Sequence, residues 1–307
     1  MSWSTAAAHR DLSRTLAGSA RHGEVMARHT TFRIGGPAAL FITCDTLSDL
    51  KKSVEVLADY GIEWTVLGRG SNVLVSDLGY DGAVIVLGRD FRKHAVEGEH
   101  LVAGGGVVLG TLVQEAYSRG LTGLEFAVGI PGTLGGALAM NAGTRESWIG
   151  SIVEGVTLFA PDAGLLGLRG SEIAWEYRRS DLPQRGIVVE AQLRVEEGDR
   201  DAIRSAMDGS LRRRKSSQPL GMPSAGSVFV NPEGDSAGRL IQSVGLKGSR
   251  CGGAVVSDVH ANFIVNEGGA TAKDVLALMR RIITAVEDAH GIQLRPEIRF
   301  LGSFEES

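Results

Sequence analysis

The chain has 307 residues, of which 43% are hydrophobic and 22% are charged, a balance typical of folded globular proteins rather than disordered ones. A net charge of -4 gives no general footprint for nucleic acid, and two distant cysteines argue against a disulfide framework or a zinc site. The uncharged stretch 126–144 is broken by a proline and five glycines, so it predicts no membrane-spanning helix. We expect a cytoplasmic protein, a monomer or weak oligomer, without a metal, nucleic acid or membrane partner.

Along the chain, residues 1–28 predict a loose leader or a short helix. The first strong helix pattern lies between Thr46, which caps its start, and Gly61, which ends it. Apolar periodicity locates the later elements. Helices are expected at 109–117, 201–214 and 271–290, strands at 64–67, 73–76, 83–87, 153–159, 187–193 and 297–301, and a loop at 218–231.

Glycine is unusually frequent, with 42 residues, and two glycine-rich loops are the first candidates for a site. One is Gly68-Arg-Gly-Ser-Asn72, directly after an expected strand. The other is Gly129-Ile-Pro-Gly-Thr-Leu-Gly-Gly-Ala137, with Asn141 after it. Glycines let several backbone N–H groups converge on phosphate oxygens. One such loop alone is better explained as a tight turn, but two with neighbouring hydroxyl and amide side chains favour a phosphate or dinucleotide site. Neither matches the P-loop or the Rossmann fingerprint.

Three other segments carry polar side chains in unusual settings. Tyr177-Arg-Arg-Ser180 lies between two expected strands, Ser227 follows a glycine and precedes an apolar run, and Glu297 begins the last expected strand. Taken singly, these are ordinary features: a surface salt-bridge partner, a turn residue and a charge at a strand edge. Composition and spacing do not join them into one site.

In chain order, however, these segments resemble one family, UDP-N-acetylenolpyruvoylglucosamine reductase, also called UDP-N-acetylmuramate dehydrogenase. The resemblance runs from about His29 to Gly302. The motifs that carry it are His29-Thr-Thr-Phe-Arg-Ile-Gly-Gly-Pro37, Leu67-Gly-Arg-Gly-Ser-Asn-Val-Leu-Val75, the Gly129–Ala137 loop, Tyr177-Arg178, Pro223-Ser-Ala-Gly-Ser-Val-Phe229, Gly252-Gly253, His260-Ala-Asn-Phe-Ile-Val-Asn266 and Pro296-Glu-Ile-Arg-Phe300.

The resemblance implies an α+β protein with an FAD-binding fold of the vanillyl-alcohol-oxidase (PCMH) type in two α/β subdomains, plus a smaller α+β substrate-binding domain. The expected boundaries are a leader at 1–28, FAD-binding subdomains at 29–88 and 89–214, with 293–307 returning to the second, and the substrate-binding domain at 215–292. Only Ser180 to Gly186 separates the Tyr-Arg motif from the next strand. That leaves no room for the extra tyrosine loop of the longer class, so the chain resembles the shorter class.

The resemblance also implies noncovalent FAD and NADPH as hydride donor. Hydride would pass from NADPH to flavin N5 and then to the enolpyruvyl ether of UDP-N-acetylglucosamine enolpyruvate, giving UDP-N-acetylmuramate for peptidoglycan synthesis. By matching position, Arg178 and Glu297 would polarise the substrate carboxylate, Glu297 in a protonated or strongly hydrogen-bonded form. Ser227 would donate a proton to carbon as general acid.

Further residues are assigned to FAD and to the substrate by the same matching. The expected FAD ligands are Gly68, Arg69, Gly70, Ser71, Asn72, Gly129, Ile130, Pro131, Gly132, Thr133, Gly135, Gly136, Ala137, Asn141 and Arg299. The expected contacts with the UDP-linked amino sugar are Tyr177, Lys215, Asn231 and His260. The chain departs from the family pattern at Val230, where lysine is common, and at Ser216-Ser217, where a basic residue is expected. Candidates for the missing diphosphate contact are Lys215, Arg214 and Lys247.

Two other functions are weighed against this one. Another FAD-dependent sugar or alcohol oxidoreductase of the same fold is the first, but many of those attach flavin to a histidine in the first glycine-rich loop, and Gly68–Asn72 has none. A non-catalytic nucleotide-binding module is the second, and it leaves Arg178, Ser227 and Glu297 unexplained.

Overall fold

The computed structural model describes residues 3–144 and 146–304. The chain forms two compact units, each built from three separate stretches of sequence. Unit 1 contains Met1–His22, Leu40–Arg69 and Gly82–Arg212, and unit 2 contains Gly23–Ala39, Gly70–Asp81 and Arg213–Ser307. Two hydrophobic clusters lie within unit 1 and a third lies within unit 2. Among the described helices, none has the length and apolar character needed to cross a membrane.

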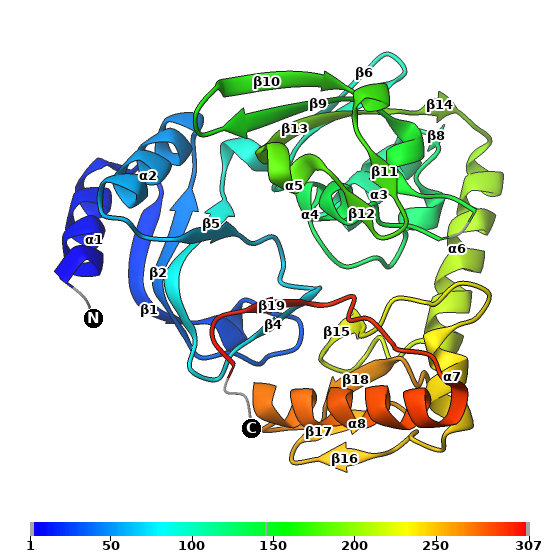
Figure 1. Cartoon of the computed structure of the whole chain (residues 1–307). Coiled ribbons are helices and arrows are strands. Elements are labelled where there is room, and N and C mark those ends of the chain that lie inside the picture. The colour runs from blue at the N-terminus through cyan, green and yellow to red at the C-terminus, as the bar shows by residue number, and fades with distance from the viewer. Residues whose placement is uncertain (1–2, 145, 305–307) are drawn as a thin grey trace. The chain divides into compact units, whose positions relative to one another are not determined.

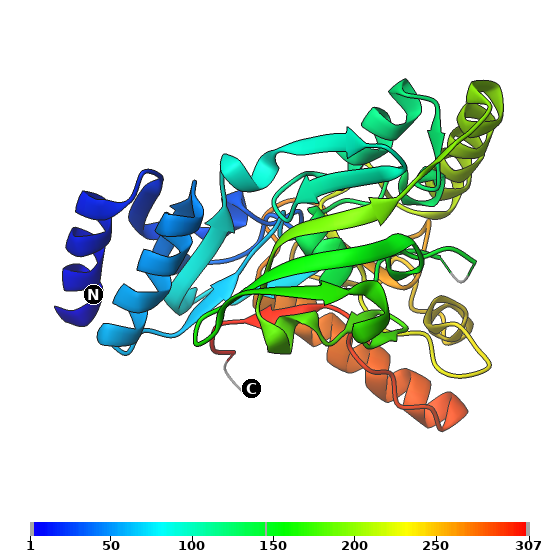
Figure 2. The ribbon, with the colours of Figure 1, turned by 90° about the horizontal axis from the view of Figure 1, so that it is seen from above.

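A four-stranded sheet, most of it in unit 1, has the strand order β1-β2-β5-β3. Its strands are β1 (Ser19–Val25), β2 (Pro37–Cys44), β5 (Tyr80–Leu87) and β3 (Trp64–Val66), with β3 parallel to β5. Helices α1 (Trp3–Thr15) and α2 (Leu47–Asp59) lie side by side, as both views show (Figures 1 and 2). Their apolar faces share one core cluster with β2 and β5. The helix expected after Thr46 is confirmed, with Thr46 as its N-cap.

The other sheet of unit 1 is antiparallel, in the order β10-β9-β13-β7-β6 (Figure 2). Its strands are β10 (Gly164–Arg169), β9 (Val153–Ala160), β13 (Ile187–Arg194), β7 (His100–Gly104) and β6 (His94–Glu97). Helices α3 (Leu109–Ser118), α4 (Leu134–Ala139) and α5 (Leu182–Arg185) pack against it around one apolar core. Two short ribbons pair β11 (Trp175–Glu176) with β12 (Arg179–Ser180) and β8 (Leu121–Thr122) with β14 (Glu196–Glu197). Helix α6 (Arg200–Ser217) follows β14.

Unit 2 is built on an antiparallel sheet in the order β15-β18-β17-β16. Its strands are β15 (Ser224–Ser227), β18 (Phe263–Asn266), β17 (Ala254–Val256) and β16 (Arg250–Cys251). Helix α8 (Ala272–His290) packs on β16 and β17, and α7 (Ala237–Ser243) contacts α8 (Figure 1). As expected, Thr271 caps the start of α8 and Gly291 ends it with a φ of 65°. The last strand, β19 (Arg299–Leu301), runs parallel to β4 (Val73–Val75).

Short 3-10 helices complete the fold. They are η1 (Met26–Arg28), η2 (Asp90–Arg92), η3 (Glu125–Ala127), η4 (Ile149–Ile152) and η5 (Gly170–Glu172).

The structure corrects the sequence-based elements in two places near the expected site. The stretch 218–231, expected as a loop, contains strand β15, and the last strand begins at Arg299 rather than at Glu297. Strand β15 has the sequence Ser-Ala-Gly-Ser, so no large apolar residue alternates along it. Its register with β18 also shifts between Ser224 and Ser227. Periodicity therefore had no pattern to detect there.

Asp49 is a buried charge that joins the start of α2 to the segment after α1. Its side chain is 4% exposed. Its carboxylate accepts hydrogen bonds from the backbone N–H groups of Ala17 at 2.9 Å, Gly18 at 3.0 Å and Asp45 at 2.9 Å. It also completes the capping box with Thr46. These bonds offset the cost of burying a carboxylate.

We expect Asp49→Ala to lower the free energy of unfolding of unit 1 by about 2–4 kcal/mol, because each buried donor left unpaired costs about 1–3 kcal/mol. Urea unfolding followed by circular dichroism measures the loss, and limited proteolysis near residue 18 reports release of α1. Asp59→Ala is the matched control, since Asp59 is exposed near the end of the same helix. Equal, small effects of the two variants would contradict the role of Asp49.

Candidate functional site

The two glycine-rich loops touch within unit 1. A Cβ added to Gly68 would lie 2.5 Å from Thr133 Oγ1, so only glycine permits this approach. In the second loop, Gly129 has a φ of 74° and Gly132 a φ of 143°, conformations that favour glycine. The sequence requirement for glycine at these positions therefore has a direct physical cause.

The backbone N–H groups of the second loop divide into two sets. Leu134 and Gly135 donate to carbonyls of the turn at 105–107, each at 2.8 Å. Within residues 3–144 and 146–304, the amides of Gly132 and Thr133 donate to no protein acceptor. Amides without a protein acceptor, in a loop whose glycines carry no side chain between the backbone and a ligand, suit the phosphate oxygens of a dinucleotide. These residues therefore fit the pyrophosphate of FAD.

The second half of the first loop belongs to unit 2. Gly70 has a φ of 60°, and a Cβ there would lie 2.3 Å from the carbonyl oxygen of His29. Asn72 Nδ2 donates to the carbonyl oxygen of Glu297 at 3.2 Å, and the Asn72 carbonyl accepts the Arg299 N–H at 2.9 Å. Asn72, expected as an FAD ligand, thus supports the segment that carries Glu297.

Asn141, another expected FAD ligand, binds protein backbone with both ends of its side chain. Nδ2 donates to the carbonyl of Glu176 at 2.9 Å, and Oδ1 accepts the Gly150 N–H at 3.1 Å. Its φ of 42° is unusual for a residue with a side chain. The Asn141 side chain therefore fixes the β11–β12 hairpin, which the sequence did not suggest.

Arg178 lies at the turn of that hairpin, with a φ of 60°. Its Nη1 donates to the carbonyl of Gly143 at 3.1 Å, and its guanidinium lies 5.4 Å from the centroid of the Tyr177 ring. Arg178 and Tyr177 therefore present a cation beside an aromatic face in unit 1, a suitable geometry for binding a carboxylate.

Ser227 and Glu297 come from distant parts of the sequence but lie on paired backbone segments of unit 2. The Glu297 N–H donates to the Val228 carbonyl at 2.8 Å, and Phe229 forms an antiparallel bridge with Pro296. Ser227 ends β15 directly after Gly226, whose φ is 77°. In the described part of the chain, its hydroxyl forms no hydrogen bond. The structure thus brings together two of the three expected catalytic residues, while Arg178 belongs to unit 1.

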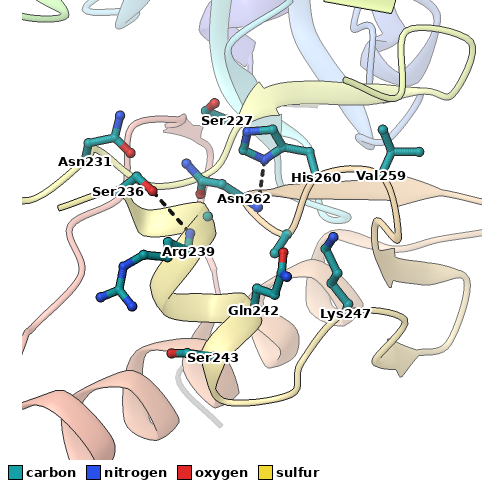
Figure 3. Close-up of a pocket in the computed structure, with 12 residues that line it drawn as sticks. Ser227, Asn231, Ser236, Arg239, Gln242, Ser243, Lys247, Val259, His260 and Asn262 are labelled. Atoms are coloured by element: carbon teal, nitrogen blue, oxygen red, sulfur yellow. Dashed lines mark hydrogen bonds between the residues drawn. The ribbon is translucent and has the colours of Figure 1, made fainter. Parts of the chain in front are cut away.

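A pocket of about 570 Å³ opens beside Ser227 within unit 2 (Figure 3). This volume lies in the range of small-molecule sites. Its lining is mostly polar and comes from β15, α7 and the loops before β16 and β18. The lining residues are Ser227, Asn231, Ser236, Gly238, Arg239, Gln242, Ser243, Lys247, Val259, His260, Ala261 and Asn262.

The two cations of the pocket differ in their surroundings. Arg239 forms a bidentate pair with Asp235, with 2.6 Å between Nε and Oδ1. The hydrogen bonds from Arg239 and from the Ser236 N–H lower the pKa of Asp235 to about 2. Lys247 forms no ion pair with any residue that the structure describes. Lys247 therefore contributes the uncompensated positive charge of the pocket.

His260 is held in one tautomer. Its Nδ1 accepts the N–H of Asn262 at 3.1 Å, which leaves Nε2 as the N–H donor of the neutral ring. Burial, and secondly the charge of Lys247, lower the pKa of His260 from 6.5. A neutral imidazole with a fixed Nε2–H can donate to a ligand in the pocket.

Among the expected substrate contacts, Asn231 and His260 line this pocket. Lys215 is exposed in the last turn of α6 and is not part of the lining, and Tyr177 lies in unit 1. Sequence reasoning had named Lys247 only as one of three alternatives. It did not single out Ser236, Arg239 or Gln242, and it assigned no role to Asn262, which lies within one of the family motifs. For α7 the available signal was Ser236, a residue type favoured at helix N-caps, which is the N-cap of this helix.

Family models match both parts of the chain. Residues 38–167 match an FAD binding domain, and residues 218–301 match the C-terminal domain of UDP-N-acetylenolpyruvoylglucosamine reductase. Together with the mixed helix and sheet content, these matches define an FAD-dependent oxidoreductase of the vanillyl-alcohol-oxidase (PCMH) fold, as expected.

Comparison with individual relatives and with a solved structure indicates the same family. The chain is 45% identical over 293 residues to the UDP-N-acetylenolpyruvoylglucosamine reductase of Heliobacterium modesticaldum, covering 95% of this chain and 93% of that protein. It is 40% identical over 294 residues to that of Bacillus licheniformis, covering 95% and 97%. The crystal structure of UDP-N-acetylenolpyruvylglucosamine reductase from Thermus caldophilus matches with a TM-score of 0.82 at 39% identity, covering 93% of this chain and 99% of that one. The chain belongs to the UDP-N-acetylenolpyruvoylglucosamine reductase family, and the expected FAD cofactor and NADPH-dependent reductase activity are confirmed.

The pKa of His260 tests the electrostatics of the pocket. We expect Lys247→Met to raise this pKa toward 6.5, because the lysine charge is removed while the burial of the ring remains. An NMR pH titration of the ring C–H signal, assigned by its loss in His260→Gln, measures the change. Lys273→Met, an exposed site on α8, is the control. An unchanged pKa in Lys247→Met would contradict the proximity of the two charges.

The same pKa shift carries a stability consequence with a defined sign. The folded pKa is lowered, so as the pH falls through 6.5 the unfolded chain takes up a proton on His260 before the folded chain does. His260 therefore removes stability as the pH falls from about 7 to its folded pKa.

Proposed function

We propose that Arg178, Ser227 and Glu297 carry the reduction of UDP-N-acetylglucosamine enolpyruvate to UDP-N-acetylmuramate in this chain. The observation that carries the proposal is the hydrogen bond between Glu297 N–H and the Val228 carbonyl, because it joins the backbone of Glu297 to the residue that follows Ser227, and Ser227 lines a polar pocket. The family membership supplies the reaction, and the geometry supports the assignment of residues.

The reaction requires these side chains to bind the substrate carboxylate and to donate a proton. When bound, FAD supplies the redox chemistry that moves hydride from NADPH to the enolpyruvyl group. Negative charge then develops on the substrate carboxylate. Arg178 and Glu297 bind and polarise that carboxylate, and the Ser227 hydroxyl donates a proton to the neighbouring carbon. A hydroxyl that forms no hydrogen bond with the described protein is available for this donation.

Lys247 is the residue that we propose for the diphosphate of the substrate. Val230 supplies no charge at the position where the family commonly has lysine, and Arg239 is neutralised by Asp235. Lys247 remains, with the Nε2–H of His260 and the amide of Asn231 in the same pocket. A diphosphate needs a cation and several donors, and this set provides both.

We also propose a location and an oligomeric state. We place the protein in the cytoplasm, since precursor synthesis uses nucleotide-linked sugars and NADPH. We expect it to be a monomer or weak oligomer. We also retain the division into a leader, two FAD-binding subdomains and a substrate-binding domain at 215–292, which the C-terminal family match at 218–301 largely overlaps.

Ser227→Ala tests the proton donor. We expect it to leave flavin reduction by NADPH nearly unchanged and to slow reoxidation by substrate by at least ~10⁴-fold, at or above the upper end of general-acid contributions. Because the hydroxyl acts mainly in the transition state, kcat should fall far more than KM rises. Stopped-flow absorbance of each half-reaction provides the measurement. Ser224→Ala, three residues earlier on β15, is the control; equal slowing of both half-reactions by Ser227→Ala would show a structural role instead.

Lys247→Met tests the diphosphate contact. We expect KM for the UDP-linked substrate to rise ~10–100-fold, as for loss of one charge-assisted hydrogen bond, with a smaller change in kcat. Lys215→Met removes a charge that lies outside the pocket lining and serves as the comparison. Steady-state kinetics at fixed ionic strength distinguish the two, and a larger effect of Lys215→Met would assign the contact to Lys215.

A further inference from the structure

Asn262 is a buried polar residue to which neither the family resemblance nor the reaction assigns a role. Its side chain is 3% exposed, and it lies between His260 and β18. Oδ1 accepts the Phe229 N–H at 2.9 Å, and Nδ2 donates to the Phe229 carbonyl at 2.8 Å. Its backbone carbonyl accepts the Val228 N–H at 2.8 Å. Asn262 therefore makes three hydrogen bonds with the two residues that follow Ser227.

We propose that Asn262 is the positioning residue for the proton donor Ser227. This inference rests on the role proposed for Ser227 and extends it to the group that fixes the serine in place. Strand β15 ends at Ser227, opposite Phe263 of β18, so no regular strand pairing continues beyond it. The Asn262 amide takes the place of the next peptide group and continues the pairing for one more residue.

The same residue connects Ser227 to the other groups of the site. The Val228 carbonyl accepts the Glu297 N–H, while the Val228 N–H binds Asn262. On its other side, the Asn262 N–H fixes the tautomer of His260. The position of the serine relative to Glu297 and to the imidazole is therefore set by one short network, seen in part in Figure 3. A general acid must lie within hydrogen-bond reach of the atom that it protonates, and a misplacement of about 1 Å costs ~10²-fold in rate.

A purely structural role is the competing explanation. Removing a buried amide leaves Phe229 with an unpaired donor and acceptor, which destabilises the fold whatever the residue does for catalysis. A loss of activity in one variant would not separate these roles. The separation comes from whether the effect of Asn262 needs the Ser227 hydroxyl.

The experiment is a double-mutant cycle on the FAD-loaded full chain. The variants are Asn262→Ala, Ser227→Ala and the two together, with flavin reduction by NADPH and reoxidation by substrate measured separately. Asn262→Asp keeps the side-chain volume and the acceptor for the Phe229 N–H, and it replaces Asn262→Ala if the alanine variant does not fold. Thr271→Ala, which removes the N-cap of α8, is the control for destabilisation of unit 2.

We expect Asn262→Ala to slow reoxidation ~10²-fold, to leave flavin reduction within about threefold, and to add less than about threefold in the Ser227→Ala background. Multiplicative effects in the double variant, or equal slowing of both half-reactions, would overturn the positioning role while leaving the role of Ser227 intact. An unchanged reoxidation rate in Ser227→Ala alone would overturn the proposed proton donor and this inference with it. Thr271→Ala should lower stability without changing the ratio of the two rates.

Discussion

The hydrogen bonds of the segment 295–299 determine how unit 2 assembles its polar groups. On one side, this segment pairs with the chain after Ser227, through the bond from Glu297 N–H to the Val228 carbonyl. On the other side, Asn72 binds it with both its side-chain amide and its backbone carbonyl. Three stretches that are distant in sequence thus become neighbours because each satisfies backbone groups of the next. The backbone positions of Glu297 and of Val228, the residue after Ser227, depend on these bonds.

The glycine-rich loops show a second constraint, which is the lack of space for a side chain. At Gly68 and Gly70 an added Cβ would come within 2.5 Å and 2.3 Å of other atoms, so these backbones lie directly against their neighbours. Among the residues that the structure describes, the N–H groups of Gly132 and Thr133 in the 129–137 loop have no protein acceptor. A glycine carries no side chain between its backbone amide and a neighbour, which suits both this packing and the approach of a phosphate oxygen. The fold and the proposed FAD site therefore both favour glycine at these positions.

The sequence predicted those elements whose signals are local. Helices α2 and α8 have capping boxes and regular apolar faces, and both begin at the expected threonine. Strand β15 was missed because it forms by pairing with β18, and its own residues, Ser-Ala-Gly-Ser, show no alternation of apolar and polar side chains. Helix α7 was missed because seven residues give too few turns for a periodic pattern.

The residues of the candidate site likewise differ in how far the sequence alone could indicate them. Ser227 and Glu297 could be named only through the family resemblance, because the hydrogen bond that joins their segments is not visible in composition or spacing. Lys247 was one of three candidates for the diphosphate contact, and only Lys215 among them was an expected substrate contact; of the three, Lys247 lines the pocket. Asn72 and Asn141 are expected as FAD ligands, and the structure adds a contact that the sequence did not indicate, because the side-chain amide of each donates to a backbone carbonyl. A side chain's neighbours in sequence do not determine which acceptor it reaches.

Charge in the pocket links recognition to protonation. The lysine that attracts an anion is also one cause of the lowered pKa of His260, so an anion bound beside Lys247 opposes that contribution and shifts this pKa upward. Burial, the larger cause, acts in the other direction and increases when a ligand excludes water. These two effects on the pKa of His260 oppose each other. The neutral ring nevertheless has a hydrogen-bond donor, because its fixed tautomer carries the Nε2–H without taking up a proton. The proposed binding of a diphosphate by Lys247 and His260 therefore requires no change in the charge of the imidazole near neutral pH.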